Sequence, residues 1–308
     1  MGNCSDPIIS NNVMKTKPLL FTFLLLSIFF SCIQPNDNKD ISVVVNDTLQ
    51  TNIDKTEKER LEKREGIEKQ DYEDSISLAK ALVGALKIAT LNIEKEKFQN
   101  KYEVISDSIS VNVEINLDYH FTKKYPHLII RRHGPNAVYI DIYNKNDRKF
   151  EKVVSHEQWV MTYVNDTIRD VNGDGLNDFV VNWYGATGCC LKAFSNVYLL
   201  RQNKNEFSNN FEFINPTFSP KEKIIRGVCY GHPGETEMYK YKWNEEMVDT
   251  IEYVGYEKND SGKKTGKIVI SNTSSCSNTF KVLKRLNSVP NEYKKIEGYD
   301  WFTGKGYE

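Results

Sequence analysis

The chain lacks an excess of either charge, since its 308 residues include 41 lysines and arginines against 42 aspartates and glutamates. A nucleic-acid-binding protein is expected to carry a clustered basic excess, so this class is disfavoured. The sequence also lacks the GxSxG and HExxH motifs and a Ser/His/Asp order. We therefore expect no nucleic-acid partner and a protein that is not an enzyme.

The chain has no hydrophobic run long enough to cross a membrane. Its longest run, residues 19–30, follows Lys15 and Lys17 and at about 1.5 Å per residue would reach roughly 18 Å of a core about 30 Å thick. A basic start, a short apolar segment and a small residue before the cut are typical of a secretory signal peptide. We predict a signal peptide over residues 14–31 and an upstream misread start over residues 1–13.

The end of this segment, Phe29-Phe30-Ser31-Cys32, resembles a bacterial lipobox, whose cysteine becomes the lipidated first residue of the mature protein. Phenylalanine replaces the commoner leucine, which the looser lipoboxes of Bacteroidetes-type bacteria tolerate. Ile33 follows where an aspartate would indicate inner-membrane retention. The resemblance implies a lipid anchor at Cys32 in the outer membrane, on its periplasmic face or at the cell surface. A plain signal peptide with an incidental cysteine is the alternative.

Residues 32–74 read as a polar and charged tether. Within residues 54–74, 15 of 21 side chains are charged, and no apolar stripe is available for packing. A solvated spacer is expected, with a partner-binding helix as the alternative. Over residues 75–101 apolar side chains recur every three or four positions, which predicts one amphipathic helix. The repeating residues are Leu78, Leu82, Leu86, Ala89 and Ile93.

Beyond residue 102 the pattern changes to alternation. Apolar and polar residues alternate over residues 109–117, as in a half-buried strand. Further short apolar segments follow, separated by turn residues at intervals of roughly 10 to 20 positions. Because no helical period intervenes, we expect antiparallel sheets. Residues 102–308 are predicted to form one mainly β domain, an antiparallel sandwich or an irregular propeller-like domain, after the N-terminal amphipathic helix.

The strongest local motif is Asp-Val-Asn-Gly-Asp-Gly-Leu-Asn-Asp at residues 170–178. Its oxygen-bearing side chains have the spacing that Ca²⁺ needs from a single loop, and Gly175 permits the sharp reversal. An EF-hand would have glutamate where Val181 stands, so this loop is of another kind. A polar β-turn is the alternative. We expect one structural calcium ion, with ligands from Asp170, Asn172, Asp174, the backbone carbonyl of Leu176, and Asp178.

The loop resembles the DxDxDGxxD loop of FG-GAP and VCBS-type β modules, which links two strands. The spacing of aromatic residues after it, through Phe218 and Trp243, is similar to a family of bacterial envelope proteins with a single FG-GAP-like loop. The resemblance extends over residues 160–255. It implies a secreted, calcium-binding β protein, and one member is described as an inhibitor of lysozyme-type cell-wall hydrolases. No inhibitory residue can be carried over.

With Cys32 assigned to lipidation and Cys4 upstream, four cysteines remain in an oxidising compartment, which predicts two disulfides. Adjacent Cys189 and Cys190 are not expected to bond to each other, so each would take one of the other two. A zinc site with His232 is the alternative, although the two-residue spacing of zinc ligands is missing. The disulfide candidates are Cys189, Cys190, Cys229 and Cys276.

Two glycine-containing, aromatic segments, residues 184–190 and 230–235, are close to these cysteines and are expected to form a rigid recognition surface. The function expected is that of a lipid-anchored envelope binding or structural protein, whose partner is an envelope protein or a cell-wall hydrolase. Inhibition of such hydrolases is the first alternative. The binding candidates are Tyr184, Thr187, Tyr230 and His232.

The second alternative is a secreted hydrolase. His120, His127 and His133 are close in the sequence and could gather on adjacent strands as an acid–base or metal site. Isolated, half-exposed strand histidines are the simpler interpretation.

Overall fold

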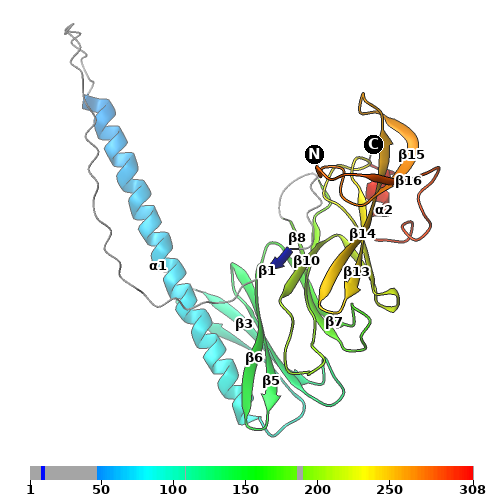
Figure 1. Ribbon diagram of the computed structural model, residues 1–308. Coiled ribbons are helices and arrows are strands. Elements are labelled where there is room, and N and C mark those ends of the chain that lie inside the picture. The colour runs from blue at the N-terminus through cyan, green and yellow to red at the C-terminus, as the bar shows by residue number, and fades with distance from the viewer. Residues whose placement is uncertain (1–7, 11–46, 108, 186–189, 308) are drawn as a thin grey trace, which may run out of the picture. The chain divides into compact units, whose positions relative to one another are not determined.

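The computed structural model describes residues 8–10, 47–107, 109–185 and 190–307, shown as ribbons in Figure 1. The chain divides into two compact units, Asn12–Asp74 and a larger unit of Met1–Asn11 with Ser75–Glu308. The predicted signal peptide, Cys32, Thr187 and Cys189 lie outside the described residues. The elements are β1 (Ile8–Ser10), α1 (Asp47–Leu91), β2 (Phe98–Ile105), β3 (Ser110–Asp118), β4 (His127–His133), β5 (Ala137–Asn146), β6 (Lys149–Trp159), β7 (Tyr163–Arg169), β8 (Asp178–Tyr184), β9 (Ala193–Tyr198), β10 (Asn210–Ile214), β11 (Pro216–Ser219), η1 (Pro220–Glu222), β12 (Ile224–Val228), β13 (Met238–Asn244), β14 (Met247–Lys258), β15 (Lys264–Ser271), β16 (Val282–Leu286) and α2 (Tyr299–Thr303).

The prediction of a mainly β fold with antiparallel sheets and an N-terminal helix is confirmed. The first sheet has the strand order β2-β3-β4-β5-β6, the second β1-β10-β9-β8-β7 and the third β11-β12-β13-β14-β15-β16. Every strand pairs antiparallel with its neighbour. Apart from the pairing of β1 with β10, every pair of neighbouring strands within a sheet is also consecutive in the chain.

The prediction of a helix over residues 75–101 is wrong at both ends, since α1 extends over Asp47–Leu91. Its charged N-terminal part was expected to be a spacer without lasting structure, yet it is helical. Side chains four residues apart form ion pairs there, and such pairs favour a helix. The helix ends early because Phe98–Ile105 alternate in burial and pair with β3. Among the described residues, no helix is long and apolar enough to cross a membrane.

Within the larger unit, the C-terminal part of α1 covers one face of the first sheet (Figure 1). Ala81, Ala85 and Ala89 are buried at every fourth position, and small side chains at this spacing let the helix axis approach the strands. The apolar side chains of β3 alternate towards the helix, as the sequence predicted. The residues they present are Val111, Val113, Ile115 and Leu117.

The second sheet lies between the other two, and β8 shows this most clearly. Phe179 and Val181 pack in a core shared with the first sheet, whereas Val180 packs in a core shared with the third. A strand that is buried on both faces reads as a continuous apolar run. The outer face of the third sheet is covered by the C-terminal segment, in which Tyr293 and Phe302 are fully buried.

An ion pair lies between α1 and the first sheet. Arg132 donates to Asp141 at 2.8 Å and to the Leu78 carbonyl in α1 at 3.0 Å. Asp141 is 1% exposed and also accepts hydrogen bonds from Lys152 and Ser155. A buried carboxylate is tolerated only with such partners, so this contact fixes where the helix sits on the sheet.

Candidate calcium loop and binding groove

The loop predicted to bind calcium connects β7 to β8 in the second sheet. Both of its glycines have left-handed backbones, with φ of 76° at Gly173 and 84° at Gly175. A Cβ added at Gly173 would lie 2.1 Å from the carbonyl oxygen of Pro220, so the loop approaches η1 more closely than a side chain allows. The loop therefore links two strands, as predicted.

The oxygens of the loop are turned inward onto its own backbone. Asp170 accepts hydrogen bonds from the N–H groups of Gly173 at 2.6 Å and Gly175 at 3.0 Å. Asn172 and Asp174 each accept one from the residue two positions later, at 3.0 Å and 2.8 Å. These contacts fold the segment without long-range partners, which explains how a short sequence specifies it.

Asp178, the last predicted ligand, is completely buried. Its carboxylate accepts hydrogen bonds at 3.0 Å from the N–H groups of Val171 and Leu200. The pKa of Asp178 is raised to about 8, mainly by burial. The two hydrogen bonds lower the pKa, and the charges of Asp174 and Asp170 raise it. A carboxyl group in this position favours a positive charge nearby.

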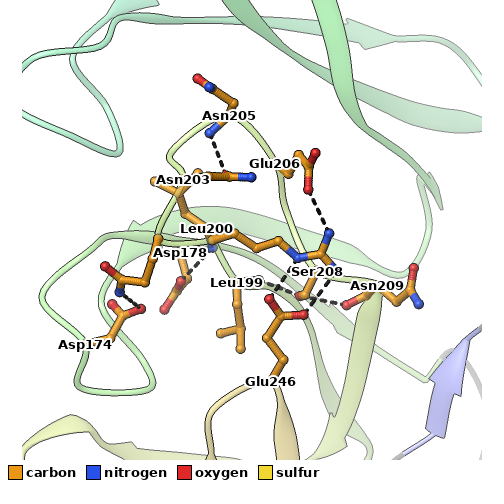
Figure 2. A network of polar contacts seen from close by, with 12 residues as sticks. Asp174, Asp178, Leu199, Leu200, Asn203, Asn205, Glu206, Ser208, Asn209 and Glu246 are labelled. Carbon is orange, nitrogen blue, oxygen red and sulfur yellow. Dashed lines mark hydrogen bonds and ion pairs between the residues drawn. The ribbon is translucent and has the colours of Figure 1, made fainter.

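Figure 2 shows how the loop meets the connection between β9 and β10. Asp178 faces the backbone of Leu200, and Asp174 accepts a hydrogen bond at 3.0 Å from Gln202 of the same connection. Arg201 beside them bridges Glu206 and Glu246. The loop is therefore held against the connection between β9 and β10, and Arg201 binds this connection to Glu246, in the turn between β13 and β14.

The donors of the loop fit a calcium ion by type, because carboxylate, amide and carbonyl oxygens are its preferred ligands. They do not yet converge: in the part of the chain that the structure describes, no three histidine, cysteine or acidic side chains are grouped so that they could hold a metal. If the ion binds, Asp170, Asn172, Asp174, the Leu176 carbonyl and Asp178 would supply its ligands, and the ion would neutralise the loop.

A groove of about 460 Å³ lies between the second sheet and β11 of the third. Its floor is a row of polar side chains that are paired in register across β7, β8 and β9. Asn182 donates to Asn165 at 2.7 Å and accepts from the Ser195 hydroxyl at 2.8 Å. Two residues earlier on β8, Val180 belongs to the apolar core, so the interior between the sheets becomes polar at this end.

Residues of both charges and four aromatic residues line the same groove. Tyr184 ends β8 and is 44% exposed. Arg169 lies over the ring of Phe218, 5.5 Å from its centroid, and Glu297 is exposed at the other side. The hydroxyl oxygen of Thr167 is buried without a hydrogen-bond partner among the described residues. The groove thus mixes polar and apolar side chains, and its two charged residues are of opposite sign.

Described residues of the two predicted recognition segments, Gly185 and Tyr230, both contact Lys192. Gly185, which follows Tyr184, donates a backbone hydrogen bond at 2.8 Å to Lys192. The ammonium group of Lys192 lies 4.8 Å from the ring centroid of Tyr230. His232 is exposed in the same turn. Of the four binding candidates, Tyr184 lines the groove, Tyr230 and His232 lie beyond Lys192, and Thr187 is outside the described residues.

The three histidines proposed as a hydrolase site are not assembled. His127 and His133 stand at opposite ends of β4, about 20 Å apart at 3.3 Å per residue. His120 and His127 both pack against Phe121, and burial lowers the pKa of His127 to about 4. Because His133 lies at the far end of β4 from His127, the three histidines do not form one site, and this interpretation is wrong.

The structure tests part of the prediction of two disulfides and of the alternative zinc site. Cys229 is disulfide-bonded, so it cannot serve as the thiolate ligand that the alternative zinc site requires. Cys190 is buried in the core beneath the C-terminal segment, whereas Cys276 is exposed. The pairing of the four cysteines stays a prediction, because Cys189 lies outside the described residues.

Sequence reasoning missed the row of Asn165, Asn182 and Ser195. One signal for it exists, since Asn182 interrupts an otherwise apolar strand directly after Val180 and Val181. Comparison of the chain with protein-family models, curated proteins and solved structures gives no match.

Proposed function

We propose that this protein is a lipid-anchored binding protein of the bacterial cell envelope, with one structural calcium ion. The observation that carries the proposal is the groove beside Tyr184, because it places hydrogen-bonded polar side chains next to an exposed aromatic ring, as small-ligand sites do. The lipobox-like Cys32 supports the anchor. The charged, exposed part of α1, with ion pairs along it, supports a spacer between anchor and domain.

The anchor is tested with the full chain in a bacterial host that processes lipoproteins. We expect the wild-type protein to incorporate labelled fatty acid and to sediment with membranes, because an acylated cysteine partitions into lipid. The Cys32→Ala variant should be unlabelled and released. Asn36→Ala, in the predicted tether after the signal peptide, is the control and should behave as wild type. A Cys32→Ala variant that still carries the label would contradict the anchor.

Calcium is expected to stabilise the fold by about 1.4 kcal/mol at a tenfold excess of the ion over its dissociation constant. The reason is that the ion neutralises Asp170, Asp174 and the buried Asp178. Thermal unfolding in EDTA and in added calcium measures this. Asp174→Ala should abolish the response, whereas Asp260→Ala, an exposed acid in a turn, should keep it. If the melting temperature of the wild type is the same in EDTA as in added calcium, the calcium site is contradicted.

Inhibition of a cell-wall hydrolase is the second candidate, and the turn between β6 and β7 favours it. Trp159, Met161 and Val164 are 51%, 73% and 57% exposed there, and clustered exposed apolar side chains mark protein interfaces. We expect the full chain to slow lysozyme, and Trp159→Ala with Met161→Ala to weaken the effect at least tenfold. Ile105→Ala, an equally exposed residue of β2, is the control. No slowing at micromolar protein would exclude this function.

A further inference from the structure

The side chains on the groove floor are all neutral hydrogen-bonding groups. Asn165, Asn182 and Ser195 carry neutral amide and hydroxyl groups, which both donate and accept. Their mutual hydrogen bonds at 2.7 Å and 2.8 Å fix the orientation of the Asn182 amide. The amide nitrogen of Asn165 has no partner in the part of the chain described here, and Asn165 is exposed. The row therefore presents oriented donors and acceptors to whatever occupies the groove.

The walls add an aromatic face and no net charge. Tyr184 stands at the end of the row with nearly half of its surface exposed. Arg169 is engaged over the Phe218 ring, and Glu297 supplies the opposite charge. An aromatic ring beside fixed, neutral hydrogen-bonding groups matches a sugar, whose ring has an apolar C–H face and a rim of hydroxyls.

We propose that this groove binds a neutral oligosaccharide, with Asn165, Asn182 and Ser195 hydrogen-bonding its hydroxyls and Tyr184 packing on a sugar face. This inference rests on the proposed binding function and names its ligand class. The volume of about 460 Å³ is within the range of small-ligand sites and admits a few sugar rings at a time.

The strands that form the floor are rigid, which favours binding. Next to Asn182 and Ser195 on β8 and β9, Trp183 and Phe194 also belong to the residues that line the groove. Their rings stack with centroids 4.1 Å apart and planes inclined by 11°. Asn215 closes one end, since it accepts from Ala193 at 2.9 Å and donates to Leu191 and Val228. A site whose side chains are held before the ligand arrives loses less entropy on binding.

Other ligand classes fit the groove less well. A peptide that extends a sheet pairs with the backbone of an edge strand, here β7 or β11. It would leave the floor side chains of β8 and β9 unused. An anionic ligand needs a cluster of cations, whereas the charged residues that line this groove are one arginine and one glutamate, Arg169 and Glu297. The neutral saccharide is the class that uses the groups present.

The test is calorimetric titration of the detergent-solubilised full chain with two probes, chitotetraose and maltotetraose, which separate N-acetylated from plain glucose polymers. We expect one of them to bind, and Tyr184→Ala and Asn182→Ala each to weaken binding at least tenfold. Tyr125→Ala, at 49% exposure a matched tyrosine outside the groove, should bind as wild type. Asn116→Ala is the matched amide control, because Asn116 is hydrogen-bonded across strands to Gln99 in the first sheet.

Three results would overturn the inference: neither sugar binds at millimolar concentration, sugar binding survives both groove substitutions, or Tyr125→Ala weakens it as much as Tyr184→Ala. A third probe, an extended Val-Thr hexapeptide, identifies a different ligand class. If the peptide binds and is lost in Tyr184→Ala while both sugars fail, the oligosaccharide is wrong and the binding function stands. Tyr184 is exposed, so its substitution leaves the fold intact, and far-ultraviolet circular dichroism verifies this for each variant.

Discussion

Replacing Asp141 with alanine is expected to lower the free energy of unfolding by about 3–5 kcal/mol, because it breaks a buried ion pair and leaves the other charge uncompensated. Arg132 is 7% exposed and donates to both Asp141 and the Leu78 carbonyl. Its Nε atom already lacks a hydrogen-bond partner among the described residues. Urea unfolding followed by circular dichroism measures the loss. Hydrogen exchange should show faster opening of residues 75–91, since the ion pair ties them to the sheet.

The matched control is the exposed pair of Lys101 with Glu114 on β2 and β3. Glu114→Ala should cost less than about 1 kcal/mol, because solvent screens surface pairs. A double variant with Arg132→Met and Asp141→Leu should recover part of the stability lost in Asp141→Ala, since no buried charge remains. If Asp141→Ala costs no more than Glu114→Ala, the ion pair does not hold α1 on the first sheet.

The fold could be predicted where local pattern and tertiary environment agree. The alternation of β3 survives in the structure because one of its faces meets α1 and the other is polar. The charged part of α1 was misjudged for the opposite reason. It has no apolar stripe to indicate packing, so its helicity depends on ion pairs four residues apart. Its end could not be found from periodicity, because Phe98 and Tyr102 fit a helix and a strand equally well.

Of the candidate sites, the one specified by local sequence could be predicted, and those that depend on strand register could not. The loop at residues 170–178 is specified locally, by side chains that bond to backbone within a few positions, and its location between strands was predicted. The polar row was not predicted, because it joins Asn165, Asn182 and Ser195 through strand register. Register depends on long-range packing, which no local motif encodes. The three histidines failed for the same reason, since their proximity in sequence placed His127 and His133 at opposite ends of one strand.

Replacing Asp178 with alanine is expected to cost about 2–6 kcal/mol, whether or not calcium is present. The substitution removes the acceptor of two buried N–H groups, at Val171 and at Leu200, each 3.0 Å away, and an unsatisfied buried donor costs about 1–3 kcal/mol. Urea unfolding in EDTA and in saturating calcium measures both conditions. Asp178→Asn should lose less, because the amide keeps one acceptor oxygen.

The Asp170→Ala variant distinguishes the structural role of the loop from its role in binding calcium. Asp170 accepts hydrogen bonds from Gly173 and from the exposed N–H of Gly175, which water can replace, so the variant should cost little in EDTA and abolish the calcium response. Asp178→Ala should be costly in both conditions, because its carboxylate joins the loop to the connection after β9. Equal costs for the two variants in EDTA would mean that Asp178 acts only as a ligand. The stability of the second sheet would then depend on the ion and not on this buried carboxylate.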